Sequence, residues 1–249
     1  MHCDLSNIGI LVTRATHQAE PLCNLIEAHG GRAIRFPVLE IQPLKPASLT
    51  TLINDSDIII FISPNAVRCG LATLSGRLQL QNKKIAAVGK TTARVLEAEG
   101  VVVDIVPQGD ADSETLLAHP ELQRMKGKRV VIVRGIGGRP LLGDTLLKRG
   151  ANLSYAEVYQ RCCPNMDSSE LLKQWDNIQI VTSTSINMLN NLLVLLGEKG
   201  FPQLIKTPLL VISQRMLQSA KAVGFQQVIL SSGASDQAIL ATLCQWKES

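Results

Sequence analysis

The chain has 249 residues, of which 45% are hydrophobic, enough to bury the cores of two ordinary domains or one large one. Its 25 basic and 21 acidic residues leave a formal net charge of +4, and only 3% of its residues are aromatic. This mild charge, with few aromatic rings on which bases could stack, argues against nucleic acid as a partner.

The N-terminal sequence MHCDLSNIGILVTR has no basic segment followed by a long apolar stretch, which is the pattern of a secretory signal. The longest candidate for a membrane segment, LLVLLG, is far shorter than the roughly 18 apolar residues that a spanning helix needs. We therefore expect a cytoplasmic protein with no membrane partner.

The cysteines and histidines do not form a recognisable metal site. No two of the six cysteines have C-x-x-C spacing, and the only close pair is adjacent in sequence, which suits neither zinc nor an ordinary disulfide. The four histidines are scattered. We predict reduced thiols and no metal for this set: Cys3, Cys23, Cys69, Cys162, Cys163 and Cys244.

Apolar, β-rich runs alternate along the chain with amphipathic stretches, the pattern of parallel strands joined by helices. Glycine directly follows the amphipathic stretches in EAHGG, EAEG, LKRG, GEKG and KAVG, where it can end a helix. The sequence therefore predicts an α/β fold. The expected strands lie near residues 8–13, 32–36, 57–62, 85–88, 101–106, 129–133, 152–158, 178–182, 208–212 and 226–230.

Similar segments recur at nearly one spacing. ILVTRA is repeated in VVIVRGI and FISPNAV in IVTSTSI, both at an offset of 120 residues, and GDADSETLLAHP is repeated in SSGASDQAILATL at an offset of 122. Three such echoes indicate an internal duplication. They pair Arg14 with Arg134, Ser63 with Ser183, and Ser113 with Ser235.

Hydroxyl, glycine and basic residues follow the predicted strands. Ligands of parallel α/β sheets bind beyond the carboxyl ends of the strands, where helix N-termini present unpaired N–H groups. This chemistry suits carboxylate or phosphate groups held without a metal ion. The candidate binding residues are Arg14, Ser63, Asn65, Gly89, Thr91, Thr92, Arg134, Gly135, Thr182, Ser183, Ser185 and Ser213.

Each of these residues also has a structural interpretation. Ser63 followed by Pro64 is an ordinary helix start, and Thr91 and Ser183 fit the same role. An arginine at such a position is more often solvated or paired with a carboxylate. The recurrence of the hydroxyl-rich pattern in both halves favours binding.

The chain has two tyrosines, Tyr155 and Tyr159, both in SYAEVYQRCCP. Their spacing of four predicts that they share one face of a strand, with Tyr159 at its end. A phenol at a strand end can donate a proton or a hydrogen bond to a substrate oxygen. The alternative is a tyrosine that covers the edge of the core with its hydroxyl in water.

The turn VVIVRGIGGRP resembles a dinucleotide-binding loop, and Glu157 lies where a ribose-binding acid would be. Position 140 is Pro140, however, where the G-x-G-x-x-G pattern requires glycine. A nicotinamide-dependent enzyme is thus a minor alternative, and no other nucleotide-binding or hydrolase motif is present. We expect no cofactor.

Six stretches, in chain order, together resemble the uroporphyrinogen-III synthase family: ILVTRA, FISPNAV, AAVGKTTARVLEAEGV, EVYQR, VTSTSINML and SSGASDQAIL. The resemblance implies a lyase of haem biosynthesis that closes hydroxymethylbilane, a linear tetrapyrrole with eight carboxylates, to uroporphyrinogen III. Ring D is inverted and water is lost. Family members use no metal and no cofactor.

In the family mechanism, loss of the terminal hydroxyl gives an azafulvene that attacks ring D, and a spiro intermediate then fragments and recloses. The resemblance implies Tyr159 as the catalytic group that helps the hydroxyl to leave. It matches Ser63, Thr91, Thr92, Thr182, Ser183 and Ser185 to substrate-binding hydroxyls. Ser213, in VISQRML, stands where many members have glycine.

The family fold implies two flavodoxin-like domains, joined by two crossing segments, with the catalytic cleft between them. Carried over, the first domain comprises residues 1–37 and 163–249, and the second comprises residues 38–162. FPVLEIQP and EVYQRCCP suit the crossings. We expect a monomer. The rival hypothesis is a non-catalytic cytosolic two-domain binding protein for a polycarboxylate or another anionic small molecule.

Overall fold

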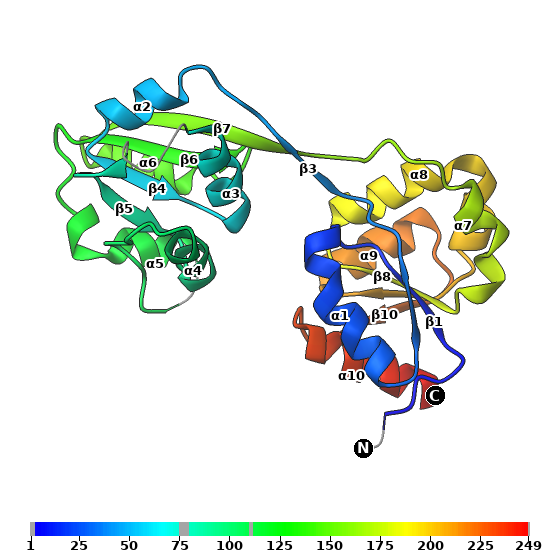
Figure 1. The fold of residues 1–249 in the computed structure, drawn as a ribbon. Coiled ribbons are helices and arrows are strands. Elements are labelled where there is room, and N and C mark those ends of the chain that lie inside the picture. The colour runs from blue at the N-terminus through cyan, green and yellow to red at the C-terminus, as the bar shows by residue number, and fades with distance from the viewer. Residues whose placement is uncertain (1–2, 75–79, 110–111, 249) are drawn as a thin grey trace. The chain divides into compact units, whose positions relative to one another are not determined.

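The computed structural model describes residues 3–74, 80–109 and 112–248, and the chain divides into two compact units (Figure 1). Unit 1 comprises Met1–Glu40 and Cys162–Ser249, and unit 2 comprises Ile41–Arg161. Each unit contains a five-stranded sheet with helices on both faces. The predicted α/β fold with two parallel-dominated sheets is confirmed.

Unit 1 has the strand order β10-β9-β8-β1-β2, with every neighbouring pair parallel. In chain order this is the 2-1-3-4-5 arrangement of flavodoxin-like folds. Its elements are β1 (Gly9–Val12), α1 (Thr16–Ala28), β2 (Arg32–Arg35), α7 (Ser169–Lys173), the 3-10 turn η3 (Trp175–Asn177), β8 (Ile180–Ser183), α8 (Ile186–Leu204), β9 (Leu209–Val211), α9 (Gln214–Val223), β10 (Val228–Leu230) and α10 (Asp236–Glu248).

Alternate residues of the strands in unit 1 face opposite layers of helices. Ile10 and Val12 pack with α1 and α10, whereas Leu11 packs with α8 and α9. Figure 1 shows α1 and α10 together on one side of this sheet. The four-residue strands are buried on both faces, which explains their continuous apolar runs.

Unit 2 has the strand order β3-β7-β6-β4-β5, and β4 is parallel to β5 and β6, as β6 is to β7. Helices α2, α3 and α4 cover one face, and α5 and α6 cover the other. Its elements are β3 (Glu40–Pro43), α2 (Leu49–Asp55), β4 (Ile58–Phe61), α3 (Pro64–Thr73), β5 (Lys84–Ala87), α4 (Lys90–Ala98), α5 (Ser113–Ala118), the 3-10 turn η2 (Pro120–Leu122), β6 (Arg129–Gly135), α6 (Leu141–Lys148) and β7 (Asn152–Cys162).

The two sheets correspond under offsets near the 120 residues found in the sequence: the strand starts differ by 120 for β1 and β6 and for β2 and β7, by 122 for β4 and β8, and by 125 for β5 and β9. Matching β1 with β6, β2 with β7, β8 with β4 and β9 with β5 gives the same spatial order in both sheets. The strand expected at 101–106 occupies the place that corresponds to β10, but it is reduced to one bridge between Ala86 and Ile105. There the Asp104 carboxylate, not a backbone carbonyl, accepts the Ile85 N–H at 2.8 Å.

Two local expectations differ from the structure. Strand β3 was not predicted. FPVLEIQP has a proline near each end, and this pattern favours a connecting segment over a strand. The helix expected to end at Gly200 continues to Leu204. Its interruption lies at Gly197 instead, where φ is 56° and the helix kinks.

The structure pairs Cys3 with Cys244 of α10 as a disulfide, with a Cα–Cα distance of 5.4 Å. The prediction of reduced thiols is therefore wrong for this pair, whose separation of 241 residues gives no local pattern to detect. The described residues contain no group of three or more His, Cys, Asp or Glu side chains that could hold a metal ion. Within the same ranges, no helix is both long and apolar enough to cross a membrane.

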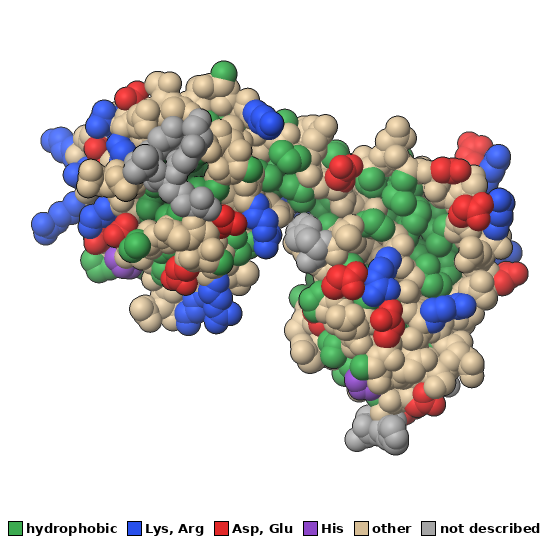
Figure 2. Space-filling model, in the orientation of Figure 1, with side chains coloured by type: hydrophobic (Ala, Val, Ile, Leu, Met, Phe, Trp, Pro, Cys, Tyr) green, Lys and Arg blue, Asp and Glu red, His purple; other side chains and the backbone are tan. Residues whose placement is uncertain are grey.

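Charge is divided unevenly between the units. Unit 2 holds 16 of the 25 basic residues and 11 of the 21 acidic ones, a difference of +5, which leaves 9 basic and 10 acidic residues in unit 1. On the face that Figure 2 shows, acidic and basic side chains are interspersed over unit 1. An anionic ligand is therefore attracted mainly to unit 2.

The disulfide predicts the thiol count. In denaturant without reductant, we expect a thiol reagent to detect four thiols per chain and six after reduction, because Cys3 and Cys244 are bonded. A Cys3→Ser variant should show five thiols both before and after reduction, because Cys244 then has no bonding partner. Six thiols before reduction would contradict the pairing.

Candidate functional site

In each sheet the strand order reverses between two central neighbours, which is where open α/β sheets bind ligands. In unit 1 the reversal lies between β1 and β8, and in unit 2 it lies between β4 and β6. The residues that follow these strands are Thr13 and Arg14 with Thr184 and Ser185, and Ile62 and Ser63 with Ile136. Several predicted site residues therefore lie at these two switch points.

Ser63 caps helix α3 in unit 2. Its backbone is extended, and its hydroxyl accepts the N–H of Ala66 at 3.1 Å, while Pro64 occupies the first helical position. This is the helix start that Ser-Pro predicts. The same hydroxyl lies 3.1 Å from the hydroxyl of Tyr159, so the cap also contacts the predicted catalytic group.

Tyr159 reaches Ser63 because of a β-bulge in β7. Arg134 pairs with Glu157, but the next residue, Gly135, pairs with Tyr159, so that Val158 is an extra residue. A bulge of this kind re-aims a side chain. Tyr159 consequently packs in the same core cluster as its neighbour Val158, on the side of α2, α3 and α4.

Tyr155 lies on the opposite face, against α6. A Cβ added to Gly143 of α6 would overlap the Tyr155 hydroxyl. The prediction that the two tyrosines share one face is therefore wrong. It assumed an uninterrupted period of two residues, which the bulge breaks between them.

Gly135 provides the space that the Tyr159 ring occupies. A Cβ at position 135 would lie 2.6 Å from two ring atoms of Tyr159. The ring is 1% exposed, and the N–H of Ile136 donates to the Tyr159 carbonyl at 2.9 Å. The tyrosine is thus fixed through both its ring and its backbone.

Arg161 covers the phenol from the solvent side. Its Nη2 donates to the Tyr159 hydroxyl oxygen at 3.2 Å, and its guanidinium carbon lies 5.4 Å from the ring centroid. Arg161 is itself exposed. The sequence indicated no role for it, since an arginine at the end of a strand is most often solvated.

The side chain of Arg134 faces away from this cluster. It donates to Glu157 Oε1 from Nε at 3.3 Å and from Nη2 at 3.2 Å, and it stacks 4.3 Å from the centroid of the Tyr155 ring. Glu157, considered as a possible ribose-binding acid, is thus paired with an arginine. Gly137 and Gly138 of the same loop both have positive φ, as a turn requires.

The other predicted residues of unit 2 lie at the starts of α3 and α4. Gly89 is the N-cap of α4, where extended backbone and no side chain leave the first N–H groups uncapped by a hydroxyl. Thr91 is exposed, whereas Thr92 is 3% exposed and packs inward. Asn65, in the first turn of α3, is partly exposed.

At the switch point of unit 1 the hydroxyls bond to the protein itself. Thr13 Oγ1 donates to the Thr182 carbonyl at 2.8 Å, and Thr182 Oγ1 donates to the Leu11 carbonyl at 3.1 Å. Both threonines are buried. Ser183, also buried, donates to the carbonyl of Ser185 at 3.3 Å. The two threonine hydroxyls join β1 to β8. Ser183 is the last residue of β8, so the interpretation of Ser183 as a helix cap is wrong, and Ser185 is the cap of α8.

The remaining predicted residues of unit 1 are two caps and a paired cation. Ser185 accepts the Met188 N–H at 3.1 Å at the start of α8, and Ser213 accepts the Met216 N–H at 3.4 Å at the start of α9. Arg14 forms an ion pair with Asp236 in the first turn of α10. Its side chain is 13% exposed.

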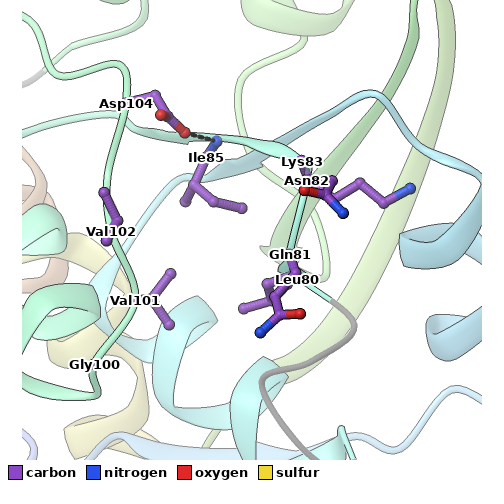
Figure 3. Close-up of a pocket in the computed structure, with 9 residues that line it drawn as sticks. All are labelled: Leu80, Gln81, Asn82, Lys83, Ile85, Gly100, Val101, Val102 and Asp104. Carbon is purple, nitrogen blue, oxygen red and sulfur yellow. Dashed lines mark hydrogen bonds between the residues drawn. The ribbon is translucent and has the colours of Figure 1, made fainter.

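Four cavities of unit 2 are lined by residues other than Ser63 and Tyr159. One of about 380 Å³ lies on the face of α5 and α6, beside Arg139 and Asp112. Hydrogen bonds from Thr115, and the charge of Arg139, hold the pKa of the Asp112 carboxyl below its usual value. A second, of about 460 Å³, lies near the amino end of β5, between Ile85, Val101 and Asp104 (Figure 3).

None of the four accounts for the predicted site. The third lies beside Leu52 of α2 and Arg129 of β6, and the fourth lies beside Pro46 and Tyr155. The second lies at the amino end of the sheet, whereas Ser63 and Tyr159 lie at the carboxyl end. The first lies on the opposite face of the sheet from Tyr159. The hydroxyl cluster at the switch point of unit 2 is therefore the candidate active site.

Comparison with known proteins identifies relatives along nearly the whole chain. The family model described as uroporphyrinogen-III synthase HemD matches residues 20–241. The uroporphyrinogen-III synthase of Escherichia coli is 34% identical over 249 residues, covering 95% of this chain and all of the relative. That of Salmonella typhimurium is 35% identical over 246 residues, with the same coverage.

Solved structures share the fold. Uroporphyrinogen-III synthetase from Helicobacter pylori has a TM-score of 0.63 at 17% identity and covers 96% of this chain and 99% of its own. A mutant uroporphyrinogen III synthase from Thermus thermophilus has a TM-score of 0.59 at 16% identity, with coverages of 97% and 100%. Because the family model matches residues 20–241 and two relatives are more than 30% identical over their whole length, the chain belongs to the uroporphyrinogen-III synthase family.

Proposed function

We propose that the chain converts hydroxymethylbilane to uroporphyrinogen III at a site built around Tyr159 and Ser63 in unit 2. Enzymes of its family are lyases of haem biosynthesis that close this linear tetrapyrrole with inversion of one ring. The observation that carries the proposal is the bulge that aims the Tyr159 hydroxyl at Ser63, 3.1 Å away, at the switch point of the sheet.

Tyr159 acts in the first chemical step, in which the substrate loses its terminal hydroxyl as water. The terminal hydroxyl of hydroxymethylbilane is a poor leaving group until it gains a proton and departs as water, leaving an azafulvene. The phenol of Tyr159 can supply that proton, because its oxygen is stabilised by hydrogen bonds to Arg161 and Ser63 after the proton leaves. Ring inversion then depends mainly on how the chain of four pyrroles is held.

The substrate's eight carboxylates require dispersed donors. In unit 2 we assign this role to Asn65, Thr91 and the uncapped N–H groups after Gly89. Thr92 packs inward, Arg134 is paired with Glu157 and Gly135 is covered by the Tyr159 ring, so we assign these three to shaping the site. In unit 1 we assign the binding role to Arg14, Ser185 and Ser213. The Thr182 and Ser183 hydroxyls donate to backbone carbonyls, so we assign these two residues to positioning this end of the sheet. The excess of basic residues in unit 2 favours the approach of a polyanion.

We also propose the domain limits expected from the family, residues 1–37 with 163–249 and residues 38–162, and the catalytic cleft that the family fold implies. We further propose a monomeric cytoplasmic enzyme that uses no cofactor. Nothing in the comparisons favours a non-catalytic binding protein or a nicotinamide-dependent enzyme.

The isomer of the product tests the proposed activity. When purified protein receives freshly generated hydroxymethylbilane and the products are oxidised, we expect chromatography to show mainly uroporphyrin III. The substrate closes to the type I isomer without an enzyme, so a protein-free sample is the control. Type I alone would reject the activity.

Removal of the phenol tests Tyr159. We expect Tyr159→Phe to lower kcat on the order of 10²-fold, the usual contribution of a general acid, with an unchanged melting temperature within a few degrees. The matched variant Tyr155→Phe removes the other hydroxyl, which lies on the opposite face, and should keep kcat within about twofold. Unchanged turnover of Tyr159→Phe would remove this residue from the mechanism.

Filling the space at Gly135 tests the placement of the ring. A methyl group in Gly135→Ala would lie 2.6 Å from the Tyr159 ring, so we expect kcat to fall and the free energy of unfolding to fall by about 1–3 kcal/mol. Gly109→Ala, whose Cβ would lie 3.5 Å from its nearest neighbour, is the control. Wild-type kinetics and stability in Gly135→Ala would show that the ring is not confined.

A further inference from the structure

The Tyr159 hydroxyl is less accessible than the residue it contacts. Tyr159 is 1% exposed, whereas Ser63, just beyond the carboxyl end of β4, is partly exposed. A substrate at this edge therefore reaches the Ser63 hydroxyl before the phenol. The proposed function leaves open how a buried phenol delivers a proton.

The hydrogen bond between Ser63 and Tyr159 can run in either direction, but the Ser63 hydrogen is available to a substrate only when Tyr159 is the donor. Arginine has donors only, so the Tyr159 oxygen accepts from Arg161 at 3.2 Å. The Ser63 oxygen accepts the N–H of Ala66 at 3.1 Å. When the Tyr159 hydroxyl donates to Ser63, the hydroxyl hydrogen of Ser63 points to neither partner and is free for a substrate.

We propose that Ser63 is the catalytic residue that protonates the leaving hydroxyl of hydroxymethylbilane, and that Tyr159 resupplies its proton from inside the protein. This inference rests on the proposed function and adds a role for Ser63 beyond helix capping and substrate binding. Arg161 is the positioning residue, because its hydrogen bond orients the phenol toward Ser63.

The relay balances in protons and electrons. The carbon–oxygen bond of the hydroxymethyl group breaks, and the oxygen leaves as water with the proton of Ser63, while the adjacent pyrrole supplies electrons to form the azafulvene cation. The Tyr159 proton moves to Ser63, and Arg161 stabilises the phenolate. When the macrocycle closes, the unsubstituted α-carbon of ring D loses a proton, which returns through Ser63 to Tyr159.

A double-mutant cycle on kcat separates the relay from direct donation by Tyr159. Ser63→Gly removes the hydroxyl, and glycine is a tolerated N-cap, so α3 should remain folded. We expect Ser63→Gly and Tyr159→Phe each to lower kcat about 100-fold, and the double variant to be no more than about twofold slower than either, because the two hydroxyls act in series. Ser63→Thr, which keeps the hydroxyl and the cap, should restore kcat to within about tenfold of wild type.

Ser235→Gly is the matched control, because Ser235 likewise accepts an N–H three residues on, from Ala238 at 3.2 Å, but lies in unit 1. It should retain wild-type kcat. A Ser63→Gly enzyme with nearly wild-type kcat, or singles whose losses multiply in the double variant, would overturn the relay while type III product still supports the synthase. A wild-type protein that gives only type I product would reject the proposed function itself.

Discussion

The β-bulge at Val158 is the feature on which the candidate site depends. Without the extra residue, Tyr159 would point to the same face as Tyr155, toward α5 and α6, and would lie far from the cap of α3. With it, the ring packs over Gly135 and its hydroxyl meets Ser63. A one-residue change in the register of one strand pair thus determines which helix N-terminus the phenol faces.

The fold places this bulge where ligands of α/β sheets bind. Both sheets have the same strand order under offsets of 120 to 125 residues, so each has a switch point between two central strands. The two points have diverged chemically. In unit 1 the buried threonines bond to the backbone of the neighbouring strand. In unit 2 Gly135 has no side chain, and the Tyr159 ring occupies the space beside it. The duplication therefore supplied two similar edges, and we assign the proton chemistry to one of them.

Sequence patterns predicted most of the strands and the helix cap at Ser63, because both depend on local chemistry. Buried parallel strands require continuous apolar runs such as IIIF, and Ser-Pro is a strong helix start. The bulge, the Arg161 contact and the Cys3–Cys244 pair depend on residues brought together by the fold. Alternation in SYAEVYQR gave no sign of an extra residue, and the resemblance to a family identified Tyr159 without indicating its partners. The short bridge at Ile105 shows the same limit, because a β-rich run does not reveal that Asp104 takes the place of a ladder carbonyl.

The chain's two tyrosines permit a direct test of where the substrate site lies. Protein labelled with ¹³C at the ζ-carbon of tyrosine should give two NMR signals, which Tyr155→Phe assigns. On anaerobic titration with uroporphyrinogen III to saturation, the account predicts that the Tyr159 signal shifts, since its hydroxyl bonds to the residue that contacts the ligand, and that the Tyr155 signal does not. A shift of Tyr155 alone, or of neither signal, would contradict a site at Ser63 and Tyr159.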